Sequence, residues 1–172
     1  MFLNYIKDFS VKKRLKIGLQ NVKSALVANS IKTVGLLVDE GYFRETKALI
    51  ECLTEKGILE ENIEVIIYRD KLKKNRDNTK PAFNAKHLKW NASINNSAVN
   101  DFIDKEFDLL ISYYDVEKAI LLIVTHDSKA HFKVGFSSVD KRLNDLMINT
   151  NVENHTVFAH ELFRYLKILN KI

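Results

Sequence analysis

At 172 residues, with 46% hydrophobic and 28% charged residues, the chain has the composition of one ordinary globular domain, which excludes global disorder. A single cysteine, Cys52, excludes an internal disulfide framework and a multi-cysteine metal cage, and five glycines with one proline disfavour a turn-rich β-sandwich. The first residues lack the pattern of a signal peptide, and no run reaches the roughly 18 apolar residues of a membrane span. We therefore expect a cytoplasmic protein without a transmembrane segment.

Residues 1–30 are predicted to form a basic, amphipathic N-terminal helix. Leu15, Leu19, Val22 and Leu26 recur at helical spacing and draw one apolar stripe. Six basic residues and one acid give this segment a charge of +5, equal to the net charge of the whole chain. Such a helix can lie on an anionic membrane or on RNA, or it can pack its leucines on the domain and expose its lysines.

Residues 31–172 are predicted to form a single α/β domain that begins with a βαβ unit. Residues 33–38 are almost continuously apolar, as in a parallel strand that helices cover on both faces. A helix over 43–56 ends at Gly57, and a second strand follows over 63–68. The crossover between these strands is expected to be right-handed.

Residues 71–96 form a polar, basic insertion that contains Pro81 and Trp90. The segment is either a functional insertion or hides an edge strand near 82–90, because long structureless loops are uncommon in compact domains. Beyond it we expect a short helix capped by Ser97, strands over 107–113 and 131–136, a further short strand over 146–149 and a final helix that contains 158–169. Periodicity does not separate helix from buried strand over 117–128, and helix is favoured because a crossover is needed there.

This order of elements indicates a three-layer Rossmann-like or flavodoxin-like sandwich with a mostly parallel sheet and an extra N-terminal helix. For the four longer strands we expect the spatial order 63–68, 33–38, 107–113 and 131–136.

Ligands of such sheets bind beyond the carboxyl ends of the strands, where the strand order switches. The acids there suit a divalent cation such as Mg²⁺, although acids that cap the following helices are a commoner explanation. The chain lacks glycine-rich phosphate-binding loops, a zinc-binding H-E-x-x-H pattern and a nucleophile elbow, so no metal or cofactor is predicted. The residues that we single out as ligand-site candidates are Asp39, Glu40, Asp70, Asp115 and Ser137.

Basic charge is confined to two segments. Residues 69–89 carry eight basic residues and two acids, a charge of +6, and the rest of the chain outside 1–30 and 69–89 sums to −6. Basic residues interleaved with Phe83 and Trp90 suit phosphate neutralisation and base stacking, whereas a solvated loop is the simpler interpretation. The candidate contacts to a polyanion are Lys12, Lys13, Arg14, Lys16, Lys23, Lys71, Lys73, Lys74, Arg76 and Trp90.

Four motifs carry a resemblance to a known family: Lys89-Trp90-Asn91, Phe107-Asp108-Leu109-Leu110-Ile111, Phe132-Lys133-Val134-Gly135 and Leu143-Asn144-Asp145-Leu146. With these motifs the chain, from Thr33 to its C-terminus, resembles an uncharacterised bacterial family of short α/β proteins, a domain of unknown function. The resemblance implies the fold and carries over no catalytic residue.

The sequence favours a non-catalytic binding or adaptor protein whose basic segments engage RNA, a ribonucleoprotein or an anionic membrane surface. The alternative is an enzyme that handles a nucleotide or another small molecule at the strand ends. A structural subunit of a larger protein assembly is the third hypothesis.

Overall fold

A computed structural model describes residues 11, 13–14, 30–72 and 80–172 of the chain. Six strands form one sheet in the order β3-β2-β1-β4-β5-β6, and every neighbouring pair is parallel. This is the 3-2-1-4-5-6 order of the Rossmann fold. Without the two-residue edge strand β3, the other five strands have the 2-1-3-4-5 order of flavodoxin-like sheets, so the sheet is consistent with both expected sandwich types. The strands are β1 (Val34–Asp39), β2 (Ile63–Tyr68), β3 (Ala82–Phe83), β4 (Leu109–Tyr113), β5 (Lys133–Phe136) and β6 (Leu146–Ile148).

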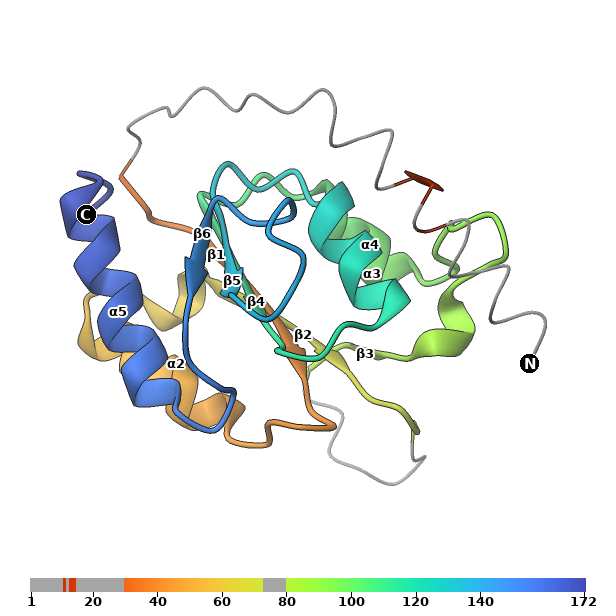
Figure 1. Ribbon diagram of the computed structural model, residues 1–172, viewed down its shortest axis with the longest axis horizontal. Coiled ribbons are helices and arrows are strands. Elements are labelled where there is room, and N and C mark those ends of the chain that lie inside the picture. The colour runs from red at the N-terminus through yellow and green to blue at the C-terminus, as the bar shows by residue number, and fades with distance from the viewer. Residues whose placement is uncertain (1–10, 12, 15–29, 73–79) are drawn as a thin grey trace.

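Helices cover both faces of the sheet, as Figure 1 shows. The helices α2 (Thr46–Glu55) and α5 (His155–Ile168) lie together on one face, and α3 (Ser97–Asp104) and α4 (Ala119–Asp127) lie on the other. Two short 3₁₀ turns, η1 (Glu60–Asn62) and η2 (Ala85–His87), lie outside these four helices. The expected three-layer α/β sandwich is therefore confirmed.

Alternation along β1 divides the core into two halves. Val34, Leu36 and Val38 face the layer of α2 and α5, whereas Leu37 faces the layer of α3 and α4. All six residues of β1 are buried, which explains the continuous apolar run that predicted a doubly covered parallel strand. The register joins Leu36 to Val65 of β2 on one side and to Ile111 of β4 on the other.

The ends of several elements differ from their predicted positions by a few residues. The short helix α3 is capped by Asn96, whose side chain accepts the N–H of Val99, and Ser97 is its first helical residue. Both residue types cap helices well, so the sequence alone does not separate them. Gly57 lies just beyond α2 with φ +100°, a left-handed conformation that glycine adopts without strain, and here the predicted stop is confirmed.

The ambiguous segment 117–128 is helical as expected. The insertion contains an edge strand, one of the two alternatives for it, and this strand covers only Ala82–Phe83 of the range 82–90. Of the predicted N-terminal helix, Val11, Lys13 and Arg14 are described as helical, and the leucine stripe lies outside the described residues. Val11 is buried in the core half formed with α3 and α4. Within the described part of the chain, no helix is long and apolar enough to cross a membrane.

Candidate functional site

The strand order reverses between β1 and β4, which is where α/β sheets of this type place their ligands. Asp39 ends β1 at this point, and Lys118 immediately precedes α4. The Asp39 carboxylate is only 1% exposed, with Oδ2 2.7 Å from Lys118 Nζ and Oδ1 accepting the N–H of Gly41 at 2.9 Å. An ion pair therefore bridges the two sides of the switch point.

Lys118 also connects this pair to the end of β2. Its Nζ lies 3.1 Å from Asp70 Oδ1, which in addition accepts the hydroxyl of Tyr68 at 2.9 Å. The ammonium stands 4.4 Å from the centre of the Tyr68 ring and 5.0 Å from that of Tyr42, within the range of cation–π attraction. One lysine thus holds two carboxylates and two aromatic rings at this edge of the sheet.

The protonation equilibria of this cluster follow from burial and from the shared ammonium. Burial raises the pKa of Asp39, and contact with Lys118 opposes part of that effect. Burial alone would lower the pKa of Lys118, but its contacts with the carboxylates of Asp39 and Asp70 raise it. Burial alone would raise the pKa of Asp70, but the hydrogen bonds from Lys118 and Tyr68 lower it. Lys118 is consequently held as a cation between the two acids.

The remaining strand-end candidates also have partners. Glu40 accepts both Nε and Nη2 of Arg69, the latter at 3.2 Å from Oε1. Asp115 Oδ2 accepts the backbone N–H of Val152 at 3.3 Å, and Ser137 donates to Asn149 at 3.1 Å.

The structure thus brings Asp39, Glu40 and Asp70 to one edge, while Asp115 and Ser137 contact the connection that leads from β6 to α5. In the part of the chain that the structure describes, no three His, Cys, Asp or Glu side chains converge as a metal site would require. The acids at the switch point are arranged around Lys118 and Arg69. Lys118 was not singled out from the sequence, because a lysine just before an apolar run has no distinctive pattern.

The second candidate region is a tight turn over residues 88–94, which we name the Trp90 turn. An antiparallel bridge joins Leu88 to Ile94, and the N–H of Lys89 donates to Ser93 O at 2.9 Å. At the tip, Ala92 adopts φ +62°, a left-handed conformation that is strained for a residue other than glycine. The turn holds Trp90 with 66% of its surface exposed.

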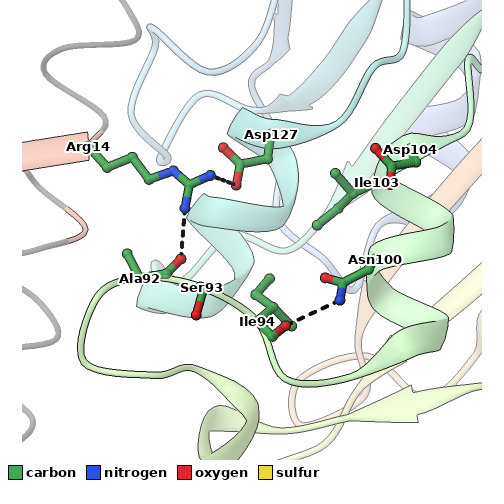
Figure 2. Close-up of a pocket in the computed structure, with 8 residues that line it drawn as sticks. All are labelled: Arg14, Ala92, Ser93, Ile94, Asn100, Ile103, Asp104 and Asp127. Carbon is green, nitrogen blue, oxygen red and sulfur yellow. Dashed lines mark hydrogen bonds and ion pairs between the residues drawn. The ribbon is translucent and has the colours of Figure 1, made fainter.

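Arg14 connects the N-terminal basic segment to this turn. Its Nη1 donates to the carbonyl of Ala92 at 3.0 Å, and its Nη2 lies 2.9 Å from Asp127 at the end of α4. Figure 2 shows the guanidinium between these two acceptors. Arg14, from the N-terminal basic segment, therefore contacts the Trp90 turn, which lies nearly 80 residues further along the chain, at the end of the basic segment 69–89.

Other basic candidates are placed only in part. Lys13, Arg14 and Lys71 are exposed, as are Lys86 and Lys89, which precede Trp90 in the chain. The candidates that lie outside the described residues are Lys12, Lys16, Lys23, Lys73, Lys74 and Arg76.

A groove of about 460 Å³ lies between the Trp90 turn and the helices α3 and α4. The turn supplies Ser93 and Ile94, α3 supplies Ile103 and Asp104, and Asp127 closes the far wall beside Arg14 (Figure 2). The sequence contained no signal for this groove, because its walls come from four separate segments.

Together these features define a Rossmann-like or flavodoxin-like α/β protein with an ionic cluster at its switch point and a turn that exposes the side chain of Trp90. The chain belongs to DUF6913, a family of unknown function whose model matches residues 7–169, as the resemblance implied. No curated protein matches the chain. No solved structure matches it either.

Proposed function

We propose that the protein is a non-catalytic binding protein that holds single-stranded RNA on the surface formed by its N-terminal basic segment and the Trp90 turn. The observation that carries this proposal is the contact of Arg14 with Ala92, which joins the N-terminal segment of charge +5 to the turn that directly follows the segment of charge +6 at residues 69–89. Phosphate neutralisation by clustered lysines and arginines is the main source of affinity in nucleic-acid binding.

Trp90 adds a stacking surface to this charge. A tryptophan that is 66% exposed forgoes the burial that such a large side chain usually gains in a folded domain. The hydrogen bonds of the turn fix the backbone on either side of the indole, so little order has to be gained when a base stacks on it. Lysines 86 and 89 stand exposed on the same stretch and supply cations for the flanking phosphates.

The switch point supports the alternative, a nucleotide-handling enzyme, less well. Asp39 and Asp70 share the Lys118 ammonium, and Glu40 pairs with Arg69, so these acids are engaged with the chain's own cations. No glycine-rich turn accompanies them to receive a phosphate.

Fluorescence of Trp90 provides a direct test because it is the chain's only tryptophan. An oligouridine of roughly twelve nucleotides, within the usual footprint of single-strand binders, should quench its emission at low salt. The affinity should fall steeply as salt rises from roughly 50 to 200 mM. No quenching and no binding at low salt would refute the proposal, as would binding that salt leaves unchanged.

Two double variants test whether RNA binds this surface or any positively charged part of the protein. Replacing Lys86 and Lys89 together by alanine should lower the affinity for labelled oligouridine about tenfold and reduce the salt slope by about two. The matched control replaces Lys47 and Lys167, two exposed lysines on the helices of the opposite face, and should leave the affinity nearly unchanged. Equal losses in both double variants would contradict the proposed surface.

A third variant and a second ligand complete the design. Trp90→Ala should weaken oligouridine binding by about 1–3 kcal/mol, the range for losing one stacked base. Vesicles rich in phosphatidylserine serve as the other anionic probe. Binding to vesicles but not to RNA would replace the proposal with a membrane-surface function.

A further inference from the structure

The groove beside the Trp90 turn has walls of two kinds. Ile94 and Ile103 provide partly buried apolar surface that continues the core beneath α3 and α4. Asp104 and Asp127 provide carboxylate oxygens, which accept hydrogen bonds and cannot donate them while ionised. Asn100 donates its side-chain NH2 to Ile94 O at 3.2 Å, and its Oδ1 adds a neutral acceptor beside the two carboxylates (Figure 2).

Both carboxylates are balanced by cations of the chain. Asp127 lies 2.9 Å from Arg14 Nη2, and Asp104 lies 2.8 Å from Lys129 Nζ. The groove therefore does not carry an uncompensated negative charge that would repel an RNA strand on the neighbouring turn.

The two acids differ in access. The side chain of Asp127 is 17% exposed and already holds Arg14, whereas that of Asp104 is 66% exposed at the rim. Asp104 is thus the acceptor that an incoming group reaches first.

A flat ring with donors along one edge matches this combination of apolar wall and carboxylate rim. Of the four RNA bases, only guanine presents two adjacent donors, N1–H and the N2 amine, to a single carboxylate. Adenine and cytosine present one exocyclic amine beside an acceptor, and uracil presents one ring N–H between two carbonyls. The volume of about 460 Å³ exceeds that of one base and its ribose.

We propose that the groove binds one guanine of the RNA strand, with the ring against Ile94 and Ile103 and its N1–H and N2 amine donating to Asp104. This inference rests on the proposed function and adds base preference to it. The base that stacks on Trp90 and the base in the groove are then near neighbours in the strand, because the turn that carries the indole also forms one wall of the groove.

The test compares oligouridine with the same oligomer carrying one central guanosine, and with versions carrying inosine or adenosine at that place. Guanosine should increase the affinity of the wild-type chain about tenfold, a gain within the range for one bidentate base contact. Inosine, which lacks the N2 amine, should lose most of that gain, and adenosine should lose all of it. An equal gain from guanosine and inosine would overturn the two-donor contact.

Asp104→Asn is the decisive variant, and Asp101→Asn is its matched control, since Asp101 is exposed on the same helix and does not line the groove. Asp104→Asn should abolish the preference for guanosine and change the affinity for plain oligouridine by less than twofold. Asp101→Asn should keep the preference. Thermal unfolding of both variants shows whether each is folded at the assay temperature.

The outcomes distinguish this inference from the function on which it rests. If wild-type protein binds all four oligomers equally, or if Asp104→Asn retains the preference, the guanine site is refuted while RNA binding stands. If no oligomer binds, the proposed function itself fails.

Discussion

Lys133 allows the electrostatics of the fold to be tested without any ligand. It is the first residue of β5, and its Nζ donates to the carbonyls of Thr125 at 2.8 Å and His126 at 3.1 Å in the last turn of α4. The ammonium thereby satisfies two carbonyls that the helix leaves unpaired. Burial lowers the pKa of Lys133 from 10.5 to about 8, against the opposing charges of Asp145 and Asp127.

Because the pKa of Lys133 is lower in the folded chain than in the unfolded chain, the free energy of unfolding depends on pH. Between pH 8 and 10.5 the unfolded chain binds the lysine proton more strongly than the folded chain does, so raising the pH through this window favours folding. Because one pKa unit corresponds to 1.36 kcal/mol, this one group should increase the free energy of unfolding by about 2.5 kcal/mol between pH 7 and pH 10.

Lys133→Met removes the titrating group and keeps much of its length. We expect the difference in the free energy of unfolding between wild type and variant to shift by about 2.5 kcal/mol in favour of wild type from pH 7 to pH 10, measured by urea denaturation. Buried tyrosines contribute equally to both proteins and cancel in the difference. Lys141→Met, at an exposed position between β5 and β6, should show no such shift. A flat difference for Lys133→Met, or an equal shift in the control, would refute the reasoning.

Three further substitutions test individual contacts by the same unfolding assay. Asp108 accepts the N–H groups of Lys32 and Thr33; burial alone would raise the pKa of this carboxyl, yet these bonds hold it below its usual range. Asp108→Asn should therefore lower the free energy of unfolding by roughly 1–3 kcal/mol at pH 7. This loss should disappear as the pH falls through the lowered pKa of Asp108, and a loss that persists at low pH would count against this account. Gly35→Ala would place a methyl group 2.7 Å from the Phe107 ring and should lower the free energy of unfolding by about 1–3 kcal/mol. An unchanged urea midpoint would mean that the Phe107 ring moves aside without a loss of stability. Tyr113→Phe removes a buried hydroxyl that donates to a carbonyl at 2.7 Å and should cost about 1–2 kcal/mol, whereas a neutral result would mean that water replaces the bond.

The layered fold was predictable because burial leaves a strong pattern in the sequence. The continuous apolar run of β1 and the helical spacing in α5 follow directly from which residues face the core. The two-residue strand β3 has no comparable pattern, because two residues are too few to show a period. The cap of α3 shifted by one residue because asparagine and serine compete at adjacent positions.

Only part of the candidate site was predictable, from the rule that ligands of parallel α/β sheets bind beyond the carboxyl ends of the strands. That rule places Asp39 and Asp70 at one edge, as observed, but it does not include Lys118, which reaches them from the start of a helix that follows β4. The Trp90 turn escaped prediction for another reason. Turn signals depend on glycine at left-handed positions, and here that position is occupied by Ala92.

The position of β1 in the sheet has a consequence for synthesis of the chain. Its edges pair with β2 and with β4, so the second edge stays unpaired until residues 109–113 have been made. At usual translation rates of about 5–20 residues per second, this delay lasts on the order of 4–14 seconds. During that time, a strand that is wholly buried in the finished protein presents apolar side chains and open peptide groups to other nascent chains. Occupancy by a ribosome-associated chaperone should therefore peak after β1 emerges and decline once β4 has left the exit tunnel.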